Sequence, residues 1–96
     1  MIADLYDRRR RALDALVSRL PDSTGRPADW TVALRRKAGE EPVIELRVAG
    51  RLSAHAALKC AVGRPDRFGV VAEGNRLTVP AERSGALLAA LREAIG

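Results

Sequence analysis

The sequence predicts an α+β fold, an antiparallel sheet of four to five strands with the N- and C-terminal helices packed on one face. Three observations lead to this class. Both ends of the chain carry apolar residues at helical spacing. Residues 30–79 contain stretches that alternate between apolar and polar, as half-buried strands do. Short loops suited to hairpins join these stretches. We expect a single domain over residues 1–96, because two domains would each approach the lower size limit for independent folding.

Residues 2–20 are predicted to form the first helix. At about 100° per residue, its large apolar side chains fall within a sector of roughly 120°. They are Ile2, Leu5, Tyr6, Leu13, Leu16, Val17 and Leu20. Pro21 ends this helix, because proline is disfavoured in a helix interior. Residues 21–29 follow as a polar connector, rich in turn residues and too short to separate two domains.

Residues 30–36 and 43–48 are predicted to be the first two strands, joined by a hairpin loop over residues 37–42. Each strand places an apolar residue at every second position: Trp30, Val32 and Leu34, then Ile44, Leu46 and Val48. Arg35 and Glu45 then lie on the outward faces, where cross-strand pairing contributes modestly to stability.

Residues 67–73 and 76–79 are predicted to form a second hairpin around Gly74-Asn75, a two-residue loop of a favoured type. With that loop, Glu73 faces Arg76 and Ala72 faces Leu77. One face of the hairpin is then apolar throughout, so the register and the expected burial agree. Its residues are Phe68, Val70, Ala72, Leu77 and Val79.

Residues 51–63 permit two interpretations. Ser53 suits the start of a helix that Gly63 would close, and the alanine content supports that helix. The apolar residues, however, occupy every second position, which favours a further strand. They are Leu52, Ala54, Ala56, Leu58, Cys60 and Val62. We favour the strand and keep the helix as the alternative.

Residues 80–95 are predicted to form the last helix. Pro80 suits the first turn of a helix, and Glu82 places a favourable negative charge near that end. The apolar face consists of Leu87, Leu88, Leu91, Ala94 and Ile95.

The charge balance favours a negatively charged partner. The chain has 17 Lys plus Arg against 12 Asp plus Glu, a net charge of +5. Such a surplus favours polyanions or the acidic face of another protein. Two clusters supply the candidate contact residues for a polyanion or a protein partner: Arg8, Arg10, Arg11, Arg35, Arg36 and Lys37.

The four-arginine run also has a purely structural interpretation. Arg9 falls at the centre of the apolar stripe, so this end of the helix projects from the body or Arg9 extends over an edge. The pairs Asp4–Arg8, Asp7–Arg11 and Arg10–Asp14 have the spacing of helical ion pairs. These pairs would satisfy much of the charge within the helix itself.

The sequence offers little for catalysis. His55 and Cys60 lie on opposite faces of a strand, or about 140° apart on a helix, so neither arrangement activates a thiolate. We expect Cys60 to be a small core residue and His55 to be exposed. No catalytic residue, cofactor, metal site or small-molecule substrate is inferred, and we expect the protein not to be an enzyme.

We therefore expect a small non-catalytic binding or adaptor protein, acting through self-association, as in a homodimer, or through assembly with a protein partner. The alternative is a basic DNA-binding or nucleoid-associated protein that uses the arginine-rich first helix. No apolar run reaches the roughly 18–20 residues that span a bilayer, so no membrane association is expected. The absence of a signal peptide and the single cysteine indicate the cytoplasm.

Overall fold

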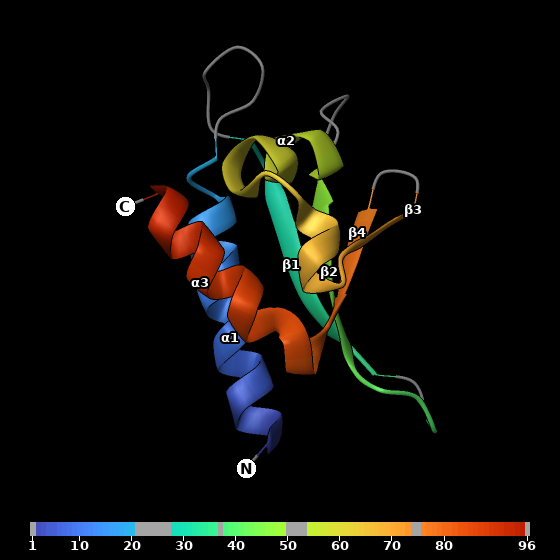
Figure 1. The fold of residues 1–96 in the computed structure, drawn as a ribbon. Coiled ribbons are helices and arrows are strands. Elements are labelled where there is room, and N and C mark those ends of the chain that lie inside the picture. Colours follow the sequence, from blue (N-terminus) through green and yellow to red (C-terminus); the bar gives the residue numbers. More distant parts are fainter. Residues whose placement is uncertain (1, 21–27, 37, 50–53, 74–75, 96) are drawn as a thin grey trace.

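A computed structural model describes residues 2–20, 28–36, 38–49, 54–73 and 76–95 (Figure 1). It confirms the α+β class. The elements in chain order are α1 (Ile2–Val17), β1 (Trp30–Arg35), β2 (Val43–Val48), α2 (Ala54–Val62), the 3-10 helix η1 (Pro65–Phe68), β3 (Val71–Glu73), β4 (Arg76–Pro80), the 3-10 helix η2 (Ala81–Arg83) and α3 (Ser84–Ile95).

The four strands form one antiparallel sheet in the order β1-β2-β4-β3. The two predicted hairpins are confirmed, with Val32 opposite Leu46 in the first and Glu73 opposite Arg76 in the second. The central contact joins β2 to β4, which are far apart in sequence. This contact places the two hairpins side by side, so β1 and β3 are the edges of the sheet.

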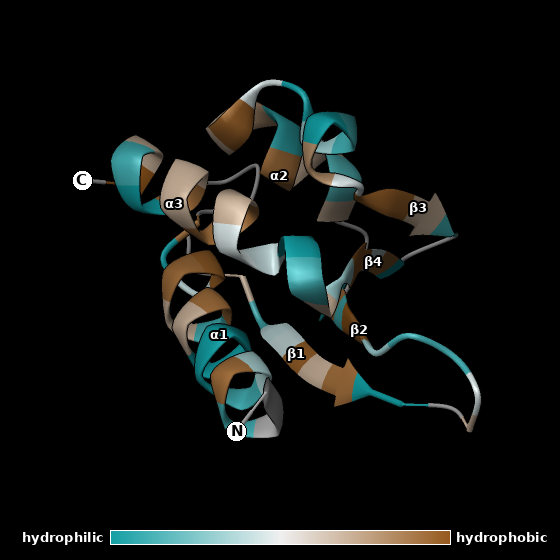
Figure 2. Cartoon of the chain, turned by 60° about the horizontal axis from the view of Figure 1, so that its bottom comes forward, coloured by the Kyte–Doolittle hydropathy of each residue, from teal (hydrophilic) through white to brown (hydrophobic). Residues whose placement is uncertain are grey.

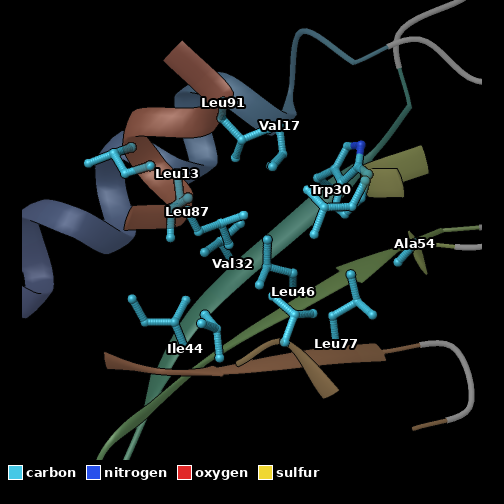
Figure 3. Close-up of a cluster of buried hydrophobic side chains, with 14 of the residues drawn as sticks. Leu13, Val17, Trp30, Val32, Ile44, Leu46, Ala54, Leu77, Leu87 and Leu91 are labelled. Carbon is cyan, nitrogen blue, oxygen red and sulfur yellow. The ribbon is translucent and has the colours of Figure 1, made fainter. Parts of the chain in front are cut away.

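The core lies between one face of the sheet and the helices. Leu13 from α1 and Leu87 and Leu91 from α3 are fully buried and point toward the inward residues of β1 and β2 (Figure 3). Leu58 brings α2 into the same apolar cluster. All three helices lie on one side of the sheet (Figure 2). Burial of these apolar side chains is the main contribution to stability, and the radius of gyration of 12.5 Å fits a compact chain of this length.

Residues 54–62 form helix α2, so the favoured strand interpretation of residues 51–63 was wrong; residues 50–53 lie outside the described part. Only Ala54 and Leu58, four residues apart, are buried, as one turn of a helix requires. The intervening Ala56 is exposed. Alanine favours helix and tolerates exposure, so its alternation with larger residues did not mark a sheet face. Gly63 closes the helix at φ +81°, and its N–H donates to the Lys59 carbonyl at 2.8 Å.

The predicted strand over residues 67–73 is shorter than expected. Residues 65–68 form η1, which begins at Pro65 and ends at Gly69 with φ +79°. The strand β3 covers only Val71–Glu73, and all three of its residues are exposed. Ala72 is therefore not a core residue, although it faces Leu77 as predicted. Phe68 packs partly buried against the core from η1 rather than from a strand.

The terminal helices are also shorter than predicted. The helix α1 ends at Val17, and residues 18–20 continue as turns in which the Arg19 N–H donates to the Leu16 carbonyl at 3.1 Å. The helix α3 begins at Ser84, after η2, and the fully buried Ser84 hydroxyl donates to the Ala81 carbonyl at 2.5 Å. Ala94, predicted on the apolar face of α3, is exposed.

Candidate functional site

Among the described residues, no helix covers the face of the sheet that lies opposite α1, α2 and α3 (Figure 2). We call it the open face. The strand registers put its residues in three rows across the sheet. The first row is Thr31, Arg47, Arg76 and Glu73; the second is Ala33, Glu45, Thr78 and Val71; the third is Arg35, Val43 and Pro80. Charged side chains thus stand beside small and β-branched apolar ones.

Glu45 is the centre of the open face. Its carboxylate pairs with the Nε atom of Arg47 at 2.6 Å, and it lies 3.6 Å from Nε of Arg35 and 3.8 Å from Nη1 of Arg76. We call Arg35, Arg47 and Arg76 the arginine triad. The Glu45 side chain is only 9% exposed, whereas those of Arg35, Arg47 and Arg76 are 61%, 48% and 41% exposed. The carboxylate is therefore covered, and the guanidinium groups face solvent.

The register explains why an acidic residue lies at this point. Arg47 of β2 stands directly opposite Arg76 of β4, and like charges in that position destabilise a sheet. Glu45 lies one row away on the same face, within ion-pair distance of both. Arg76 has a second partner, because its Nη2 atom donates to Glu73 at 3.2 Å. Glu45 therefore compensates a repulsion that the sheet register creates.

Arg10 is used within the fold. Its Nη1 atom donates to the Val32 carbonyl of β1 at 3.3 Å. The Ala49 N–H donates to the Asp29 carbonyl at 2.9 Å. Because backbone hydrogen bonds of an antiparallel pair involve every second residue of a strand, the N–H and C=O groups of residues 31, 33 and 35 of β1 also point toward β2. The backbone groups of Val32 therefore point to the free edge of the sheet, and the Arg10 side chain covers that edge.

Arg9 is also bound to the protein's own backbone. Its Nη1 atom lies 3.2 Å from the Ala81 carbonyl and 3.3 Å from the Glu82 carbonyl, both in η2. The Tyr6 ring lies below this guanidinium, with 6.0 Å between the Cζ atom and the ring centroid. A Cβ atom at Gly85 would come within 3.2 Å of the Arg9 guanidinium. Arg9 thus connects α1 to the start of α3.

Asp7 compensates the rest of the arginine run. Hydrogen bonds from Arg11, and then from Arg10, hold the pKa of the Asp7 carboxyl below its ordinary value. The shortest atom pair to Arg11 is 2.5 Å and that to Arg10 is 3.2 Å. The predicted Asp7–Arg11 pair is confirmed, whereas Arg10 pairs with Asp7 rather than with Asp14. Arg8 is exposed and makes no ion pair within the described part of the chain.

The predicted contact residues do not form one patch. Arg8, Arg10 and Arg11 belong to α1, on the side of the sheet opposite the open face. Arg35 joins the arginine triad, and Arg36 is exposed just after β1. Lys37 lies outside the described residues.

Sequence reasoning missed two members of the triad, Arg47 and Arg76. The available signal was their outward position in two predicted hairpins, of which the second had its register predicted correctly. The missing information was that β2 pairs with β4, which no local pattern specifies. Only that pairing brings the two residues together.

The helix α2 carries the candidate thiol and imidazole. Cys60 is exposed rather than a core residue as expected, because the helix directs Leu58 inward and Cys60 outward. His55 is exposed, as predicted. Residues five apart on a helix project about 140° from each other. Across the described ranges, no group of three His, Cys, Asp or Glu residues could hold a metal ion.

Among the helices that the structure describes, none combines the length and apolar character needed to cross a membrane. No protein-family model, curated protein or solved structure matches this chain.

Proposed function

We propose that this protein is a small non-catalytic binding or adaptor protein that acts through self-association or through assembly with a protein partner. The contact surface in this proposal is the open face. A cytoplasmic location belongs to the same proposal, because the single Cys60 cannot form an internal disulfide.

One observation carries the proposal: the helices cover one face of the sheet, while the other presents arginine side chains beside partly exposed apolar ones. Val71 on this face is 53% exposed, and Ala33, Val43 and Thr78 are each partly exposed. Arginine is enriched at protein interfaces and often contributes strongly to binding. An extended face of this composition is suited to a flat protein surface rather than to a small molecule.

The test uses a substitution on the open face and a matched control. Val71→Asp adds a charge to that face, and Ala89→Asp adds the same charge to an exposed position of α3. Sedimentation velocity over a range of concentrations measures self-association. Affinity capture from the source cells, followed by binding to each purified candidate, measures partner assembly.

We expect wild type and Ala89→Asp to self-associate or to bind the same purified partner, and Val71→Asp to lose that association. The proposal is contradicted if the protein is strictly monomeric and none of the purified candidate partners binds it. Equal binding by all three proteins would contradict the assignment to the open face.

Duplex DNA binding through the first helix is the second candidate function. It is favoured by Arg8, which is exposed and lacks an ion pair among the described residues, and by Arg11, whose side chain is 70% exposed. It predicts an affinity that falls steeply with salt. In fluorescence anisotropy with a labelled duplex, Arg8→Gln/Arg11→Gln should weaken binding of all sequences about equally. Unchanged affinity would remove this site.

A further inference from the structure

We infer that the open face binds an acidic segment of a partner protein, and that the arginine triad supplies its binding centre. This inference rests on the proposed function and adds the chemistry of the partner. A segment with carboxylates spaced among small apolar residues fits the alternation of arginine and apolar positions on the face.

The charge distribution of the open face selects a negatively charged partner. Glu45 lies beneath the triad with its side chain 9% exposed, so an approaching molecule meets three guanidinium groups before it meets this carboxylate. Glu73 is the other acid of the face, and it pairs with Arg76. A second copy of the chain, whose net charge as a whole is +5, would bring the same arginine triad against this one. An acidic partner meets no such repulsion.

The geometry leaves donors available for incoming carboxylates. The 3.6 Å distance from Arg35 and the 3.8 Å distance from Arg76 to Glu45 are too long for hydrogen bonds. Arg47 alone has a short contact with Glu45, at 2.6 Å. Each guanidinium can offer two parallel N–H groups to a carboxylate, the strongest ion-pair geometry in proteins. The Arg35 side chain makes no hydrogen bond among the described residues, and Arg76 keeps its Nε and Nη1 donors beside the Nη2 atom that donates to Glu73. Arg35 and Arg76 are therefore the two residues best placed to bind the partner.

The rest of the face favours a protein segment over nucleic acid. None of the three aromatic residues of the chain lies on the open face: Trp30 points into the core, Tyr6 belongs to α1 and Phe68 to η1. Bases therefore have no ring to stack on. The carboxylates of Glu45 and Glu73 oppose a phosphate backbone, whereas the partly exposed Ala33, Val43 and Val71 offer apolar contact that a peptide can use.

The experiment measures binding of a fluorescein-labelled (Glu-Ala)₆ peptide to the full chain by fluorescence anisotropy, at about 0.1 M salt, where the Debye length is about 10 Å. The uncharged (Gln-Ala)₆ peptide is the reference probe. Arg35→Gln/Arg76→Gln removes the two available donors and keeps the Arg47–Glu45 pair. Arg19→Gln/Arg92→Gln is the matched control, with the same charge change at exposed positions outside the open face.

A second pair of variants changes binding in the opposite direction. Glu45→Gln removes the carboxylate that competes with the partner for the triad, and Glu93→Gln removes the same charge from an exposed position of α3. We expect Glu45→Gln to tighten binding of (Glu-Ala)₆ by about fivefold, the contribution of one exposed ion pair, and Glu93→Gln to leave it within about twofold. Both substitutions raise the net charge by one, so a gain confined to Glu45→Gln is not a general effect of charge.

We expect Arg35→Gln/Arg76→Gln to weaken binding by about tenfold or more and its control to change binding by about twofold or less. The inference is overturned if (Glu-Ala)₆ binds no better than (Gln-Ala)₆, or if both arginine double variants lose the same affinity. It is also overturned if a labelled DNA strand depends on the triad more strongly than the peptide does. If binding to a partner protein or to a second copy is lost in Val71→Asp but unchanged in the triad variants, the proposed function is supported and this inference is wrong.

Discussion

Replacement of Leu58 by alanine tests the most consequential correction to the predicted fold, the helix α2. Leu58 is the only large side chain of α2 that is fully buried. Truncation of a buried leucine costs about 2–5 kcal/mol, from lost transfer free energy and the cavity left behind. The helix α2 has nine residues and lies at the margin of the core, where the structure relaxes around a cavity more easily than at the centre of the core. We therefore expect Leu58→Ala to lower the unfolding free energy by about 2–3 kcal/mol.

That loss is large for a chain of 96 residues, whose total unfolding free energy is expected to be about 5–14 kcal/mol. It corresponds to a fall in Tm of roughly 10–20 °C. Urea unfolding is measured by circular dichroism and by fluorescence of Trp30, the only tryptophan, which is buried at the start of β1. Both signals should report the same midpoint if the chain unfolds in one step.

Cys60→Ala is the control for this experiment. Cys60 is exposed on α2, so its truncation should change the unfolding free energy by less than about 0.5 kcal/mol. On a strand, Leu58 and Cys60 would point to the same face and both truncations would be costly. Similar losses for the two variants would therefore refute the helical placement of residues 54–62.

Three further predictions concern the arginine run and the glycines. Asp7→Asn should destabilise the protein near neutral pH and not at low pH. Because the pKa of Asp7 is lower in the folded protein than the value of about 3.9 expected in the unfolded chain, the ionised carboxylate stabilises the fold above that pH. This stabilisation is lost as the pH falls through the folded pKa. Urea unfolding of wild type and variant at both pH values checks this, and a difference independent of pH contradicts it. Gly69→Ala and Gly39→Ala should each cost about 1–3 kcal/mol, because both glycines have positive φ. Gly69→Ala should cost up to about 1 kcal/mol more, because its Cβ atom would displace Nη1 of Arg83, which lies at 2.7 Å, and disturb the 3.0 Å hydrogen bond from Arg83 to the Arg67 carbonyl; equal losses in thermal unfolding would mean that this hydrogen bond contributes nothing. Arg10→Ala should promote aggregation in light scattering by uncovering the sheet edge, whereas Arg8→Ala should not, and identical scattering would show that the edge needs no cover.

The strand pairs could be predicted from the sequence because their pattern was complete. In β1 and β2 the inward positions hold Trp, Val, Leu or Ile and no alanine, so a period of two has one interpretation. The Gly74-Asn75 loop fixed the register of β3 against β4 through its length alone.

The α2 segment lacked such a pattern. Alanine is counted as apolar, yet it is stable when exposed and is the best helix former. With alanine at positions 54 and 56, alternation with Leu58 looked like a strand although only two residues of α2 needed burial. A weighting by side-chain size would have left Leu58 and Val62 as the strong apolar signals of α2, and their spacing of four residues fits one turn of a helix as well as a period of two.

The candidate site depended on contacts between distant segments. Arg35 and Glu45 were placed together by the first hairpin, and Arg76 entered only through the pairing of β2 with β4. The conspicuous arginine run gave a poorer guide, since Arg9 and Arg10 donate to backbone carbonyls of η2 and β1. Charge counts in a sequence do not distinguish an arginine that binds its own fold from one that faces a partner.

The covered edge at β1 has a consequence for assembly size. A strand that joined the sheet at β1 would have to displace Arg10 from the Val32 carbonyl, whereas β3 presents an edge on which the described residues show no such cover. Growth of the sheet between copies must therefore begin at β3. Joining β3 to β3 uses the accessible edge of both copies at once, so such growth stops at a closed two-fold pair and does not propagate into a fibre.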